Sequence, residues 1–154
     1  MLTSQQIGGI IVRRLHMDSV DCRSFSEDFL SFVQGCIQHI DESVLRRITR
    51  PELYDTDDSV EVCFFQAADN VSDDELEKEY VRHGLVPVNP YLLARVNEND
   101  PGFPIGYPNL TVWKDDEGWH FVSFEQEIEG LIVSVQSSPG GHLGYYWFAG
   151  LRKQ

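Results

Sequence analysis

The sequence predicts an α+β fold in which N-terminal helices pack on a C-terminal antiparallel β-meander of about four strands, with one further strand at 60–66. Two observations lead to this prediction. Up to residue 100, apolar residues recur at helical spacing behind capping residues, and from residue 110 onward they alternate with polar residues between turn signals. A chain of 154 residues suffices for one domain, so we expect a single globular domain over 1–154.

Two helices are predicted before residue 50. Thr3 and Gln6 form a capping box ahead of a first apolar series, and Ser24 and Glu27 form a second one ahead of a helix expected over 24–40. The first series comprises Ile7, Ile10, Ile11 and Leu15, and the second comprises Phe29, Phe32, Val33, Cys36, Ile37 and Ile40. The second series has the i, i+3, i+4, i+7 spacing of an amphipathic helix and predicts the main organiser of the core.

The middle of the chain predicts one strand and one capped helix. Apolar residues alternate with others over 60–66, which is typical of a short strand. Ser72 and Glu75 have the spacing of a capping box, and Gly84 is a stop signal, so a helix is expected between them.

A further short helix is predicted from Asn89–Pro90 to Asp100, because proline is tolerated at the first helical position. The segment 101–108 contains three prolines and two glycines, so we expect it to be neither helix nor central strand.

The C-terminal third predicts a β-meander. Strands at 110–114 and 119–125 flank the hairpin loop 115–118. A third strand contains Leu131, Val133 and Val135, and after the turn at 139–141 a last strand covers 145–151.

The charge of the chain is concentrated in its centre. The formal net charge is −13, and residues 51–100 hold thirteen acidic residues against three basic ones. A field of this sign repels nucleic acid and anionic lipid, so we expect neither direct nucleic-acid binding nor membrane binding. It would speed association with a basic protein surface. A purely solubilising role is the alternative.

These observations favour a non-enzymatic acidic interaction protein, an inhibitor or antagonist of immunity, anti-defence or nucleic-acid-mimic type that docks on a basic partner. The residues predicted to contact the partner are Asp55, Asp57, Asp58, Asp73, Asp74, Glu75, Glu77, Phe103 and Tyr107. A structural homo-oligomeric subunit is a further alternative, and the sequence leaves both the partner and the oligomeric state open.

An enzymatic alternative uses Cys22 and His142. Cys22 precedes a predicted capped helix, where the helix dipole lowers a thiol pKa, and His142 opens a strand in Gly141-His142-Leu143-Gly144-Tyr145. This local pattern resembles NlpC/P60-type cysteine peptidases, which place the cysteine at a helix start and the histidine in a glycine-flanked strand opening. The resemblance implies a cysteine hydrolase with Cys22 as nucleophile and His142 as base. Arg23 follows Cys22 where that family has a small Ser-Gly pair.

No cofactor or metal ion is expected. Asp55 and Asp57 begin like a calcium loop, but Val60 and Gln66 stand where that loop needs glycine and glutamate. The five histidines lack zinc-ligand spacing, and no phosphate-binding glycine motif occurs.

Two further patterns bear on function. Glu125, Glu127 and Glu129 would share one face of a strand and raise one another's pKa, which is a requirement of acid catalysis. The aromatic residues of the predicted strands divide between core and surface. On the surface they would suit a protein partner better than nucleic acid, which needs interleaved basic residues.

A cytoplasmic location is expected. The three cysteines show no C-x-x-C spacing, and residues 1–5 lack the basic and apolar regions of a secretory signal. No apolar run reaches the roughly 20 residues of a membrane-spanning helix.

Overall fold

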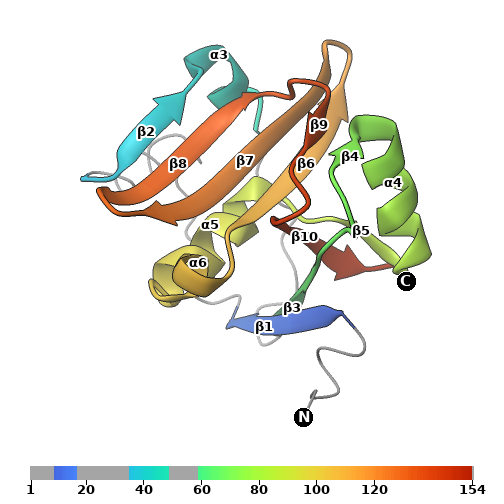
Figure 1. The fold of residues 1–154 in the computed structure, drawn as a ribbon, viewed down its shortest axis with the longest axis horizontal. Helices are drawn as coiled ribbons and strands as arrows, with labels where there is room; N and C mark the ends of the chain where they lie inside the picture. Colours follow the sequence, from blue (N-terminus) through green and yellow to red (C-terminus); the bar gives the residue numbers. More distant parts are fainter. Residues whose placement is uncertain (1–8, 17–34, 49–58, 154) are drawn as a thin grey trace.

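The computed structural model describes residues 9–16, 35–48 and 59–153 and is built around a large mixed sheet (Figure 1). The strands of this sheet are β1 (Ile10–His16), β2 (Ile37–Ile40), β3 (Ser59–Phe65), β5 (Leu85–Pro87), β6 (Asn109–Asp115), β7 (Gly118–Glu127), β8 (Gly130–Ser137) and β10 (Trp147–Arg152). Their order is β1–β3–β10–β6–β7–β8–β2, and β5 pairs with β10. A separate two-stranded sheet consists of β4 (Val71–Ser72) and β9 (Gly141–His142).

Four helices are described: α3 (Glu42–Leu45), α4 (Asp73–Arg82), α5 (Pro90–Asn99) and α6 (Phe103–Gly106). In Figure 1, α4 lies on the right beside β5 and β10, and β8 and β2 lie on the left. No helix in the described ranges has the length and apolar character that crossing a membrane requires.

The last strand lies in the middle of the sheet. Along one edge, β10 pairs antiparallel with β3. Along its other edge, it pairs first in parallel with β6 and then antiparallel with β5. Gly150 makes this possible, because a Cβ there would lie 2.7 Å from the Val86 carbonyl oxygen. Only glycine allows the backbone of β5 to approach so closely.

Both faces of the sheet are covered, so the core has two parts. On β3, Val62 and Phe64 join the α5-side core, and Cys63 and Phe65 join the α4-side core. This follows from the period of two in a strand, which sends successive side chains to opposite faces. A sheet covered on both faces needs apolar residues at consecutive positions, as β3 shows.

The helices predicted after residue 70 are confirmed. Ser72 accepts a hydrogen bond from the Glu75 N–H at 3.2 Å, and Glu75 accepts one from the Ser72 N–H at 3.0 Å, which completes the capping box of α4. Asn89 caps α5 through the Tyr91 N–H at 2.8 Å. The hairpin of β6 and β7, the strand at 60–66 and the strand β8 are also confirmed.

The predicted fold class is wrong. In the first half, strands stand where helices were expected, and in the second half the last strand, β10, lies between β3 and β6 and is parallel to β6 instead of continuing an antiparallel meander. Ile10 to His16 pair over their whole length with β3, and Ile37 to Ile40 pair with β8. The β-branched residues of these segments suit a pleated surface better than a helix. The remainder of the helix expected over 24–40, up to residue 34, lies outside the described residues, as do Ile7 and the capping pair Thr3 and Gln6.

The result is a large mixed sheet with short helices instead of a small C-terminal meander covered by N-terminal helices. The segment 101–108 also departs from expectation, because Phe103–Gly106 forms one helical turn. Pro104 stands in the first turn, where the missing N–H costs nothing.

Candidate partner-binding surface

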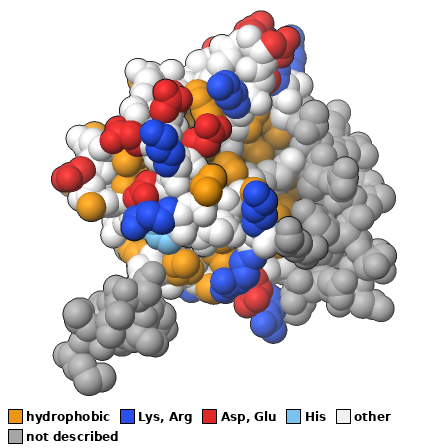
Figure 2. All heavy atoms as spheres, turned by 90° about the vertical axis from the view of Figure 1, so that its right-hand side faces the viewer, with side chains coloured by type: hydrophobic (Ala, Val, Ile, Leu, Met, Phe, Trp, Pro, Cys, Tyr) orange, Lys and Arg blue, Asp and Glu red, His pale blue; other side chains and the backbone are white. Residues whose placement is uncertain are grey.

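The acidic residues predicted on the helix after Ser72 lie at the start of α4. Asp74, Glu75 and Glu77 are exposed, and no Lys or Arg of the described residues forms an ion pair with them. Asp73 is mostly buried, because its carboxylate accepts hydrogen bonds from Ser138 Oγ at 2.8 and 3.0 Å. The capping hydrogen bonds from Ser72 lower the pKa of Glu75. Figure 2 looks onto this side of the molecule and shows Lys and Arg interspersed with the acidic side chains.

The other predicted contact residues that the structure describes, Phe103 and Tyr107, do not add to this surface. Asp55, Asp57 and Asp58 lie outside the described residues. Phe103 is 3% exposed and packs edge-on against Phe64, with ring centroids 4.9 Å apart. Tyr107 is half-buried and stacks on Phe103. Phe103 thus anchors this segment to the α5-side core, whereas Ile105 of the same helix is exposed.

A second acidic cluster combines carboxylates with tyrosines. Glu125 and Glu127 lie two residues apart on β7 and share a face, as the alternation predicts. Tyr145 Oη donates to both Glu125 oxygens at 2.9 Å, and Tyr146 Oη donates to Glu125 Oε2. The two tyrosine rings stack with centroids 4.5 Å apart. We call Glu125, Glu127, Tyr145 and Tyr146 the tyrosine–glutamate cluster.

This cluster holds more negative charge than its surroundings compensate. Hydrogen bonding to Glu125 and its negative charge raise the pKa of Glu127, and Glu129 adds to the effect. Burial raises the pKa of Tyr146, and the Glu125 carboxylate raises it further. Within the described part of the chain, no Lys or Arg forms an ion pair with Glu125 or Glu127. Two neighbouring carboxylates without a compensating cation form an acceptor site for a positive group.

A shallow groove of about 630 Å³ lies beside Tyr145. Its walls are Gln66, Ala67, Ala68, Asp69, Asn70, Leu143, Gly144 and Tyr145. Two hydrogen bonds at 2.9 Å hold the walls together, from Gln66 Nε2 to the Tyr145 carbonyl and from the Gly144 N–H to Asn70 Oδ1. A Cβ at Gly144 would lie 2.7 Å from the Asp69 backbone, so this approach requires glycine.

Exposed apolar side chains border the cluster and the groove. Tyr145 is 43% exposed and Leu143 is 48% exposed. Ile128 is fully exposed at the β7–β8 turn, between Glu127 and Glu129. Apolar residues within an acidic surface are typical of protein-binding sites, where aromatic anchors supply most of the binding free energy.

Cys22, the nucleophile of the hydrolase alternative, lies outside the described residues. His142 is buried in the α4-side region, where its ring contacts Phe121 and Phe148. Burial lowers the pKa of His142, and Asp73, with Oδ1 3.6 Å from Nε2, opposes this shift.

A hydrogen-bonded row that the sequence analysis missed joins Ser137, His120 and Asp115. His120 Nδ1 lies 3.2 Å from Ser137 Oγ, and His120 Nε2 lies 2.8 Å from Asp115 Oδ1. The hydrogen bond to His120 is the largest cause of the lowered pKa of Asp115. His120 is 1% exposed, and Ser137 lines neither this groove nor the cavity described below. The row ties β6, β7 and β8 together.

Among the described residues, no three His, Cys, Asp or Glu side chains are grouped so that they could hold a metal ion. Comparison of the chain with protein-family models, curated proteins and solved structures gave no match. The function proposed below therefore rests on the physical chemistry of the tyrosine–glutamate cluster.

Proposed function

We propose that this protein is a non-enzymatic acidic interaction protein that docks on a basic surface of another protein through the tyrosine–glutamate cluster and its groove. One observation supports this most directly. Glu125 and Glu127 share a face without a compensating cation among the described residues, directly beside the exposed ring of Tyr145.

This arrangement suits an arginine of the partner. A guanidinium donates a fork of N–H groups that matches a carboxylate, and its flat face stacks on an aromatic ring. Glu125 offers the carboxylate, Tyr145 offers the ring, and Glu127 adds a second negative charge. An incoming cation would favour the ionised form of Glu127 and would offset the negative charge of Glu125 that raises the pKa of Glu127.

The acidic residues of α4 would act at longer range. Asp74, Glu75 and Glu77 are exposed and contribute to the field that steers a basic partner. An acidic protein that covers a basic surface excludes the nucleic acid that this surface otherwise binds. We therefore propose an inhibitor or antagonist, of the immunity, anti-defence or nucleic-acid-mimic type.

Affinity capture from the native host tests this proposal. Wild-type protein and Glu125→Gln/Glu127→Gln would be immobilised side by side, with Asp74→Asn/Glu77→Gln as a control of equal charge change. We expect a basic partner that the wild type and the control retain and that the cluster variant loses. Equal capture by all three proteins would contradict a role of the cluster. A homo-oligomer on a sizing column, without a second protein, would favour the structural-subunit alternative.

A further inference from the structure

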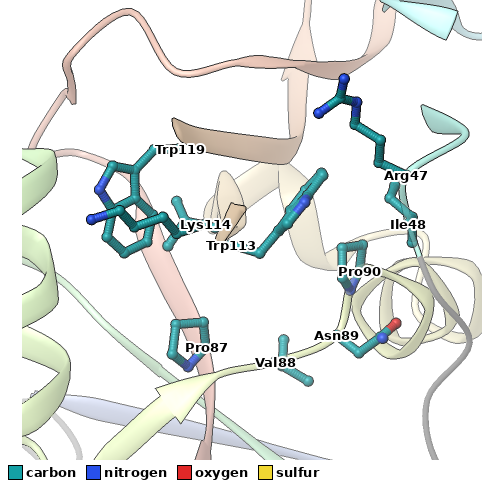
Figure 3. Close-up of a pocket in the computed structure, with 10 residues that line it drawn as sticks. Arg47, Ile48, Pro87, Val88, Asn89, Pro90, Trp113, Lys114 and Trp119 are labelled. Carbon is teal, nitrogen blue, oxygen red and sulfur yellow. The ribbon is translucent and has the colours of Figure 1, made fainter. Parts of the chain in front are cut away.

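A second cavity lies between α3, the β5–α5 connection and β6, and Figure 3 shows the residues around it. Its volume is about 420 Å³, which is within the range of small-molecule sites. The lining residues are Arg47, Ile48, Pro87, Val88, Asn89, Pro90, Val112, Trp113, Lys114 and Trp119. No residue of the tyrosine–glutamate cluster lines this cavity, and the cavity shares no lining residue with the groove beside Tyr145.

The walls of the cavity are flat and apolar. Trp113 stands in the middle of the view in Figure 3, with Trp119 and Lys114 on one side and Ile48 and Pro90 on the other. The β5–α5 wall is held against β6 by Thr111 Oγ1, which donates to the Val88 carbonyl at 2.6 Å. A preformed slot between rigid aromatic and proline side chains favours a planar ligand, because little side-chain freedom is lost on binding.

The charged groups that line the cavity are both cations, Arg47 and Lys114. The indole N–H of Trp113 is buried and has no acceptor in the described structure. This nitrogen has almost no accessible surface, so a molecule in the cavity does not reach it. None of the ten described lining residues is acidic, although the chain as a whole carries a net charge of −13.

The two cations have different surroundings. Arg47 pairs with Asp115 and Glu117, so those carboxylates compensate its charge. Lys114 forms no ion pair with a described residue, and its Nζ lies 5.6 Å from the centroid of the Trp119 ring. Lys114 is therefore the cation that is available to an anionic group at the mouth of the cavity.

We propose that this cavity binds a small molecule that combines a flat apolar ring with an anionic group. The ring would lie against Trp113 and the prolines, and the anionic group would pair with Lys114. This site is additional to the partner-binding surface, so either could fail without the other.

Phenyl phosphate is a suitable probe, because it joins one flat ring to one anionic group. The chain has three tryptophans, so ¹⁵N-labelled protein gives three indole N–H resonances, which single Trp→Phe variants assign. We expect the Trp113 resonance to shift saturably, with a dissociation constant of about 1 mM or lower. The Trp147 resonance should stay in place, because Trp147 does not line the cavity.

Two comparisons make the test specific. Lys114→Gln should weaken phenyl phosphate binding about tenfold, the loss expected for one charge-assisted hydrogen bond. Lys78→Gln, which removes an exposed charge on α4, should leave it unchanged. Inorganic phosphate and benzyl alcohol should each bind more weakly than phenyl phosphate. The proposal is overturned if the Trp113 resonance shows no saturable shift, if Lys114→Gln binds like the wild type, or if either partial probe binds as tightly as phenyl phosphate.

Discussion

Tyr145 donates its phenolic hydrogen to the carboxylate of Glu125, 20 residues earlier in the chain, with both oxygens at 2.9 Å. This contact fixes an exposed aromatic ring above a pair of glutamates. Tyr146 approaches the same carboxylate from a half-buried position, and its ring stacks on that of Tyr145. The cluster is thus preorganised, so little conformational freedom is lost when a partner binds.

The two tyrosine hydroxyls should differ in their effect on stability. Tyr146→Phe removes a half-buried hydrogen bond to a carboxylate and should lower the free energy of unfolding by about 1–2 kcal/mol. Tyr145→Phe removes an exposed one and should cost less than about 1 kcal/mol. Urea denaturation of both variants measures the difference. A larger loss for Tyr145→Phe would show that the burial of the two rings is not as described.

The repulsion between Glu125 and Glu127 should appear as a pH-dependent effect on stability. The folded protein raises the pKa of Glu127, so this residue binds protons more tightly in the folded than in the unfolded state. Stability is then lost as the pH rises through the folded pKa. Glu127→Gln should therefore raise the melting temperature at pH 7 relative to the wild type, and this gain should shrink toward pH 4. A gain that is the same at both pH values would contradict the coupling.

His142 should make stability depend on pH in the opposite direction. Burial lowers its pKa below the usual 6.5, so the unfolded state binds the proton more tightly. Stability is then lost as the pH falls through the unfolded value. Between pH 7.5 and pH 5.5 the wild type should lose more stability than His142→Gln, as measured by thermal unfolding. The same loss in both proteins would show that His142 is not buried as a neutral side chain.

The inward orientation of the 101–108 segment can be tested with two substitutions. Phe103→Ala removes a buried ring from the α5-side core and should cost about 3–5 kcal/mol. Ile105→Ala changes a side chain that is 66% exposed and should stay within about 0.5 kcal/mol of the wild type. Chemical denaturation measures the free energy of unfolding of both variants. An almost unchanged value for Phe103→Ala would restore the docking role of Phe103 that is expected from the sequence.

Sequence reasoning succeeded where the signal is local. The capping box of Ser72 and Glu75 and the Asn89–Pro90 helix start involve hydrogen bonds within a few residues, so their residue types specify them directly. The β6–β7 hairpin is likewise specified by its turn and its flanking alternation.

Sequence reasoning failed where pairing is non-local. Ile10 pairs with Phe65 and Ile37 with Ile132, and no local pattern identifies such partners. Ile37 and Ile40 have a spacing that also fits a helix, but pairing with β8 makes this segment a strand. The candidate surface was predictable in part, because the alternation of Glu125 and Glu127 places them on one face. Their contact with Tyr145 depends on the fold of the β9–β10 connection and could not be predicted.

The central claim is that the tyrosine–glutamate cluster contacts a basic partner, and the salt dependence of association tests it most directly. Stopped-flow association with the captured partner would be measured from low to physiological salt for the wild type, Glu125→Gln/Glu127→Gln and Asp74→Asn/Glu77→Gln. We predict that the rate falls steeply with salt for the wild type, because steering between opposite charges is screened. Both variants should show a smaller slope, and only the cluster variant should also dissociate faster, because it alone loses direct contacts. A flat salt dependence in the wild type, or unchanged dissociation of the cluster variant, would contradict the claim.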